Sequence, residues 1–133
     1  MSEYINGSEL INVASAGCDE VIQDFLPVGV TVLGAPQKIG KTFFCLQLSN
    51  AIADEVEFLG HTVQQGRVVY CALEDTKEKI KKRYELFGCQ ASEQIDFIFN
   101  DSVQEFNIEH ELNHFTSKYE NIRLFVIDTF AKM

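Results

Sequence analysis

Residues 40–42 read glycine, lysine and threonine, and they directly precede an apolar helical pattern. A phosphate-binding loop of the form G-x-x-x-x-G-K-[ST] uses its backbone N–H groups, its lysine and its hydroxyl to hold phosphates and Mg²⁺. Counted back from Gly40, the position of the first glycine is occupied by Ala35, and Gly34 lies one residue too early. The loop therefore departs from the general pattern at one position, and the rest of the chain must decide what it binds.

Two acidic residues stand at the ends of other apolar runs. Glu74 comes directly after the run 67–73, and Asp128 ends the run 122–128. Ligands of parallel α/β sheets bind at the carboxyl ends of the strands, so we expect both acids to converge with the loop on one site. A carboxylate and a hydroxyl suit Mg²⁺, which predicts Asp128 and Thr42 as metal ligands. Glu74 is then placed to orient a water molecule for attack on a phosphate.

Strand-like and helix-like patterns alternate along the chain. Near-continuous apolar runs are typical of strands that are covered on both faces, and the alternation predicts right-handed βαβ units and a parallel sheet. The predicted fold class is α/β, with residues 1–27 as a lead-in segment and residues 28–133 as one nucleotide-binding domain. We expect strands at residues 30–33, 67–73, 95–100 and 122–128, and helices at residues 41–53, 75–87 and 108–119.

The helix after the second strand has recognisable start and stop signals. Asp75 stands three residues before Glu78, which is the spacing of a capping box, and Gly88 follows the last helical residue. The bases between Lys77 and Arg83 spread around this helix and alternate with acids, so a solvated face is a better interpretation than a nucleic-acid contact.

Composition excludes several classes of protein. The 133 residues suit one domain, and 46% hydrophobic content with two prolines indicates a globular chain. The formal net charge of −9 argues against a dedicated nucleic-acid surface, which needs clustered bases. The chain has no apolar run long enough to span a membrane and no signal peptide, and its four cysteines are widely spaced. We therefore expect a cytoplasmic protein without a membrane partner and without a cysteine zinc site.

Three segments resemble the RecA-like P-loop ATPases. They are GVTVLGAPQKIGKTFFCLQL (residues 29–48), GRVVYCALEDTKEKIKKRYELFG (66–88) and IRLFVIDTFAKM (122–133). They are most similar to the branch of plasmid and phage AAA ATPases that includes the hexameric replicative helicase RepA. In that branch the loop often reads Ala-Pro-Pro-Lys-x-Gly-Lys-Ser, so Ala35 agrees with family usage. The resemblance implies a three-layer α/β/α core over roughly residues 25–133.

The same resemblance implies ATP and Mg²⁺ as cofactors and assigns roles to residues. Lys41 and Thr42 resemble the Walker A residues, Asp128 the Walker B acid and Glu74 the catalytic glutamate. Lys41 counts as catalytic together with Glu74 because it reaches the transferred phosphate. The expected nucleotide-binding residues are Ala35, Pro36, Gln37, Lys38, Ile39, Gly40, Lys41, Thr42 and Phe43.

The family core continues beyond the Walker B strand with further strands, an arginine finger or sensor, and DNA-contacting loops. We therefore expect residues 28–133 to be the N-terminal, partial core of an ATPase that couples ATP hydrolysis to DNA replication or recombination. A module that binds nucleotide without hydrolysing it, or serves in assembly, is the open alternative. The resemblance also implies a homo-oligomeric ring, while the exposed strand edges of a partial sheet would equally allow a dimer. It implies a nucleic-acid partner only for a complete family member.

A second motif competes with this interpretation. Residues 110–114 read HELNH, which matches the H-E-x-x-H helix of zinc hydrolases. At about 100° per residue, His110 and His114 fall opposite the apolar stripe that contains Leu112 and Phe115. Both histidines should then face solvent, which favours a surface helix over a zinc site.

Overall fold

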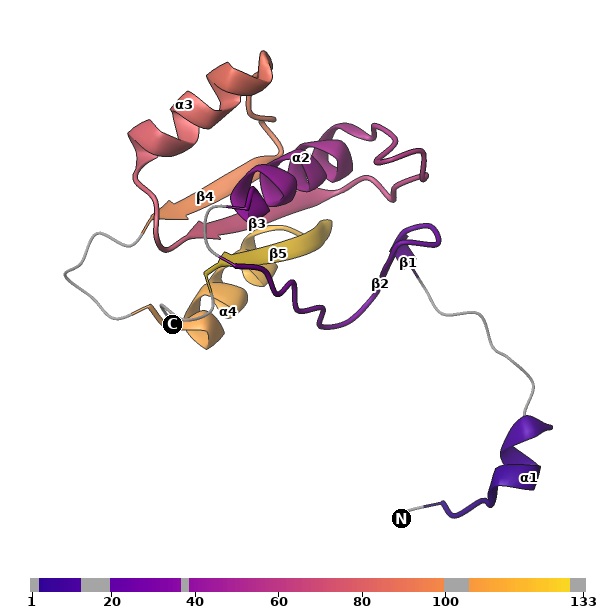
Figure 1. The fold of residues 1–133 in the computed structure, drawn as a ribbon. Coiled ribbons are helices and arrows are strands. Elements are labelled where there is room, and N and C mark those ends of the chain that lie inside the picture. The colour runs from indigo at the N-terminus through magenta and orange to yellow at the C-terminus, as the bar shows by residue number, and fades with distance from the viewer. Residues whose placement is uncertain (1–2, 13–19, 37–38, 100–105, 130–133) are drawn as a thin grey trace.

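A sheet of three parallel strands lies at the centre of the computed structural model (Figure 1). The central strand β3 (Arg67–Ala72) pairs with β4 (Ile95–Phe99) on one side and with β5 (Ile122–Asp128) on the other. The predicted α/β class with a parallel sheet is therefore confirmed. The structure describes residues 3–12, 20–36, 39–99 and 106–129.

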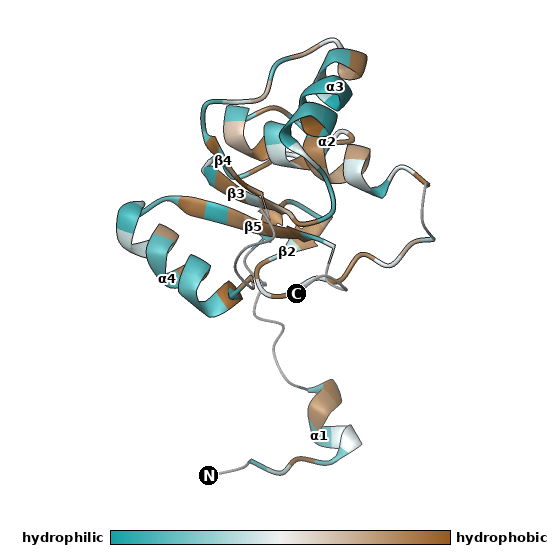
Figure 2. Cartoon of the chain, turned by 90° about the vertical axis from the view of Figure 1, so that its left-hand side faces the viewer, coloured by the Kyte–Doolittle hydropathy of each residue, from teal (hydrophilic) through white to brown (hydrophobic). Residues whose placement is uncertain are grey.

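Helices cover both faces of this sheet, which makes three layers. α2 (Lys41–Asp54) and α3 (Lys77–Phe87) lie on one face, and α4 (Ile108–Lys118) lies on the other (Figure 1). Figure 2 shows hydrophobic strands between the helical layers and a largely hydrophilic α4. Side chains along β3 alternate between the two faces, as a pleated strand requires. Val68, Tyr70 and Ala72 pack in the core under α2 and α3, and Val69, Cys71 and Leu73 pack with Phe115 of α4.

The helices begin and end at identifiable residues. α3 starts at Thr76, whose hydroxyl accepts a hydrogen bond from the Lys79 N–H at 3.3 Å. The predicted cap at Asp75 is therefore wrong by one residue, because that carboxylate binds Arg83 instead. Gly88 ends α3 with φ of 72°, as predicted.

No described helix is long and apolar enough to cross a membrane.

The predicted strand at residues 30–33 is wrong. These residues are irregular, and Val30 and Val32 are 98% and 86% exposed. A short apolar run becomes a strand only where a neighbour provides a hydrogen-bond ladder and a packing surface. Within the described residues β5 is the edge of the sheet, and residues 30–33 do not pair with it. Residues 30–36 instead form an irregular segment that precedes α2 in the chain (Figure 1).

The lead-in segment contains a hairpin that the sequence analysis did not predict. β1 (Glu20–Ile22) and β2 (Leu26–Pro27) form a small antiparallel hairpin. Ile22 is fully buried and forms an isolated bridge with Val63, so this hairpin contributes to the same core as α2. The short helix α1 (Gly7–Ile11) has no buried residue.

Gly66, directly before β3, allows a close approach between β3 and β5. A Cβ atom at this position would lie 2.7 Å from the backbone oxygen of Asn121 and would overlap the side chain of Arg123. The Asn121 oxygen cannot easily move, because it accepts the Arg67 N–H at 2.9 Å. The tight register of the two strands therefore depends on glycine at position 66.

We expect Gly66→Ala to lower the free energy of unfolding by about 3 kcal/mol, the upper end of the range for overpacking. Chemical denaturation measures this loss. Gly7→Ala is the matched control, since a Cβ at Gly7 meets no atom within 4 Å and should leave stability unchanged. Equal stability of the two variants would contradict the described strand register.

Candidate functional site

The N-terminus of α2 presents unblocked backbone amides. Gly40 caps the helix with φ of 94°, a left-handed conformation, and provides no side-chain hydrogen bond. A Cβ at Gly40 would meet nothing within 4 Å, so conformation rather than space requires the glycine. The first backbone bond of the turn runs from the Phe44 N–H to the Gly40 oxygen at 3.0 Å. Among the described residues no side-chain cap occupies the preceding N–H groups, and the helix dipole favours an anion beside them.

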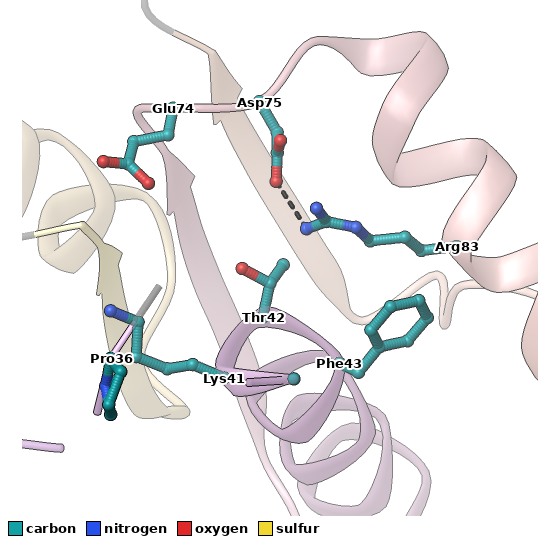
Figure 3. A pocket seen from close by; sticks show the side chains of 8 residues that line it. Pro36, Lys41, Thr42, Phe43, Glu74, Asp75 and Arg83 are labelled. Atoms are coloured by element: carbon teal, nitrogen blue, oxygen red, sulfur yellow. Dashed lines mark hydrogen bonds and ion pairs between the residues drawn. The ribbon is translucent and has the colours of Figure 1, made fainter. Parts of the chain in front are cut away.

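A cavity of about 590 Å³ lies in front of this turn. Figure 3 shows Thr42 projecting from the start of α2 towards the loop that carries Glu74 and Asp75, with the Lys41 side chain beside Pro36. The volume is in the range of pockets that hold small molecules. One wall consists of Pro36, Gly40, Lys41, Thr42 and Phe43, and the other of Glu74, Asp75 and Arg83.

Asp128 lies behind Thr42 and is almost completely buried, with 6% of its surface exposed. Its Oδ2 atom accepts two hydrogen bonds of 2.8 Å, one from the Thr42 hydroxyl and one from the Tyr70 hydroxyl. Its Oδ1 atom accepts the Thr129 hydroxyl at 3.1 Å. Two residues that are 86 positions apart, Thr42 and Asp128, are thus in direct contact at the carboxyl end of β5.

Burial controls the ionisation of the groups around Asp128. Burial, followed by the nearby charge of Asp128 and the hydrogen bond to it, raises the pKa of Tyr70 far above its ordinary value. Burial and the Asp128 charge also raise the pKa of the Cys45 thiol to about 11, although Lys41 opposes the shift. Tyr70 therefore keeps its hydroxyl proton, and Cys45 stays a protonated, half-buried thiol at neutral pH.

Arg83 enters the site from α3, which the sequence analysis did not predict. Its Nη1 atom donates to Asp75 Oδ2 at 2.5 Å, and its guanidinium lies 5.4 Å from the centroid of the Phe43 ring (Figure 3). The expectation of a solvated face is wrong for this residue. Arg83 follows Ile80 by three positions, so it lies beside the buried stripe of the helix. The spacing between Ile80 and Arg83 is the feature of the sequence that could have identified Arg83 as a residue beside the core.

The remaining residues of the expected loop differ in their placement. Ala35 is half-buried and Ile39 is 64% exposed, and neither lines the cavity. Gln37 and Lys38 lie outside the described residues.

His110 and His114 of the HELNH motif are both exposed on α4, as the helical periodicity predicted. Elsewhere in the described part of the chain, no three histidine, cysteine or acidic side chains gather in a way that could hold a metal ion. The zinc hydrolase alternative therefore has no assembled ligand set among these residues.

Comparison with known proteins gives one match. A family model described as an AAA domain matches residues 11–133. No curated protein and no solved structure matched the chain. The family match covers the hairpin, the sheet and both walls of the cavity.

Proposed function

The chain belongs to this AAA domain family, and from that premise we propose that it binds ATP with Mg²⁺ at the start of α2 and hydrolyses it. The observation that carries the proposal is the contact between Thr42 and Asp128 beside the open amides of the first helical turn. A hydroxyl and a buried carboxylate that share a hydrogen bond next to an anion site suit a magnesium–phosphate ligand.

The residues at the start of α2 and the buried Asp128 have specific roles in this proposal. The backbone N–H groups of the first turn of α2 bind phosphate oxygens, and Lys41 neutralises the terminal phosphates. Thr42 and Asp128 together hold Mg²⁺, whose oxygen ligands they provide. When bound, the metal neutralises charge on the phosphate oxygens. The fit to Mg²⁺ rests on the chemistry of these two side chains and on their direct contact.

Glu74 is the proposed general base. It is exposed at the end of β3, lines the cavity and forms no hydrogen bond with another described residue. The neighbouring Asp75 is engaged by Arg83, which leaves Glu74 as the carboxylate of this pair that can orient a water and accept its proton. The Asp75–Arg83 pair also fixes the loop that carries Glu74.

The resemblance to the RepA-like branch supports a more specific role, work on DNA during replication or recombination by a self-associating ATPase. Stimulation of ATP hydrolysis by single-stranded DNA tests this role separately from nucleotide binding. A turnover rate that DNA leaves unchanged would restrict the proposal to the nucleotide site.

Thermal unfolding tests the binding proposal. ATP with Mg²⁺ at about 100 times its dissociation constant should stabilise the fold by about 2.7 kcal/mol, which corresponds to a rise in Tm of about 10 °C. AMP at the same concentration should give a much smaller rise, because it lacks the phosphates that Lys41 and the helix N-terminus bind. Equal shifts with ATP and AMP, or no shift, would contradict the proposal.

A further inference from the structure

We propose that Tyr70 is a positioning residue for magnesium, because its hydroxyl fixes the carboxylate of Asp128 in the orientation that the metal requires. The inference rests on the proposed function of the site. It concerns a buried tyrosine on the middle strand of the sheet, which reaches the site only through its hydrogen bond to Asp128; neither Tyr70 nor Asp128 is among the residues that line the cavity.

The tyrosine is held rigidly. Tyr70 is fully buried, and β3 places it between Phe97 of β4 and Val126 of β5. Its ring packs against Phe97 with a centroid separation of 5.6 Å. Since Asp128 is two residues beyond Val126 on the same strand, both side chains project from the same face of the sheet. The 2.8 Å bond from the Tyr70 hydroxyl to Asp128 Oδ2 is therefore set by strand register.

The Thr42 hydroxyl alone cannot hold the Asp128 carboxylate in a fixed orientation. The Thr42 hydroxyl, which also donates to Asp128 Oδ2 at 2.8 Å, is itself a proposed ligand and must direct a lone pair at the metal. It stands at the first turn of α2, where the proposed phosphate and metal bind, so it cannot serve only to orient Asp128. The Tyr70 hydroxyl is not a proposed metal ligand and only donates to Asp128. It keeps Asp128 oriented before the metal arrives, as outer-shell partners do in other metal sites.

The test compares nucleotide affinity with and without the metal. For the wild type and for Tyr70→Phe, the dissociation constant of ADP is measured by calorimetry in Mg²⁺ and again in EDTA. The affinity gain due to Mg²⁺ should fall by about 10-fold to 100-fold in Tyr70→Phe, while the EDTA affinity stays unchanged. A merely structural role would leave the Mg²⁺ gain unchanged.

Tyr84→Phe is the matched control. Tyr84 is another buried tyrosine, and its hydroxyl donates to Asn50 Oδ1 at 2.9 Å, away from Asp128. Removing this hydroxyl makes the same chemical change and should preserve the full Mg²⁺ gain. If Tyr70→Phe and Tyr84→Phe lose the Mg²⁺-dependent gain in ADP affinity equally, the inference is overturned. The loss would then result from a general destabilisation of the core.

Failure of the inference is separable from failure of the proposed function. A wild-type chain that does not bind ADP in either condition contradicts the proposed function. If Mg²⁺ clearly raises the ADP affinity of the wild type and Tyr70→Phe retains this gain, the role of Tyr70 is contradicted and the proposed function is not.

If Tyr70→Phe does not fold, the wild type labelled with ¹³C at the tyrosine ζ-carbons provides the measurement. The chain has four tyrosines, so the Tyr70 resonance is assigned by removing the other three in turn. Adding Mg²⁺ to the ADP complex should shift the Tyr70 resonance, because the metal polarises the carboxylate that accepts its hydrogen bond. A Tyr70 resonance that does not respond to Mg²⁺ would overturn the inference.

Discussion

Lys41→Ala should lower the affinity of the chain for ATP by about 100-fold. A hydrogen bond between charged groups contributes about 1.5–3 kcal/mol, and each 1.4 kcal/mol is a factor of ten in affinity. Lys41 is half-buried at the first position of α2 and lines the cavity beside the open helical amides. Loss of its charge therefore removes the principal side-chain contact for the terminal phosphates. Equilibrium titration with a fluorescent ATP analogue measures the change.

Lys82→Ala is the matched control for this loss. Lys82 is exposed on α3 and does not line the cavity, so its removal changes net charge equally without touching the site. The control should bind the analogue as the wild type does. Equal weakening in both variants would show that general electrostatic attraction, and not the start of α2, holds the nucleotide.

Glu74→Gln should lower the rate of ATP hydrolysis by about 10²–10⁴-fold, the usual contribution of a positioned general base. Glutamine keeps the shape of the side chain but cannot accept the proton of the attacking water. Because Glu74 is not among the residues that hold phosphate or metal, ATP affinity should remain close to that of the wild type. A steady-state phosphate-release assay, with affinity measured in parallel, separates the two effects.

Glu78→Gln is the control for the lost negative charge, since Glu78 is exposed in the first turn of α3 and does not line the cavity. It should hydrolyse ATP at the wild-type rate. If Glu74→Gln retained wild-type turnover, another group would have to activate the water. If the wild type bound ATP but did not hydrolyse it, the alternative of a non-hydrolysing nucleotide module would be supported instead.

The sequence predicted those elements of the fold whose signals are long and continuous. The apolar run at residues 67–73 becomes β3, and the helical pattern that begins at Lys41 becomes α2. The error at residues 30–33 has a physical cause. Apolarity shows that a segment can be buried, but it does not identify the neighbour that would pair with it. The hairpin around Ile22 was missed because strands of two and three residues are too short to show a period.

The candidate site was partly accessible from the sequence for a topological reason. The carboxyl ends of parallel strands meet at one edge of a sheet, so Glu74 and Asp128 could be expected at the same edge. The contact of Thr42 with Asp128 was anticipated through a strand at residues 30–33 that the structure does not have, although the contact itself is present. Tyr70 could not be singled out, because a tyrosine inside an apolar run is read as a core residue. Only the register of β3 against β5 shows that its hydroxyl reaches Asp128. Arg83 was hidden in a run of lysines whose members are otherwise exposed.

The most direct test of the central claim is a calorimetric titration of the wild-type chain with ATP, performed once in Mg²⁺ and once in EDTA. We predict saturable binding at one site per chain, with higher affinity in Mg²⁺, because Thr42 and Asp128 together provide the metal ligands. Absence of saturable binding in both conditions would contradict the assignment of a nucleotide site to the start of α2. Binding of equal affinity in both conditions would contradict the role of Thr42 and Asp128 as a magnesium site.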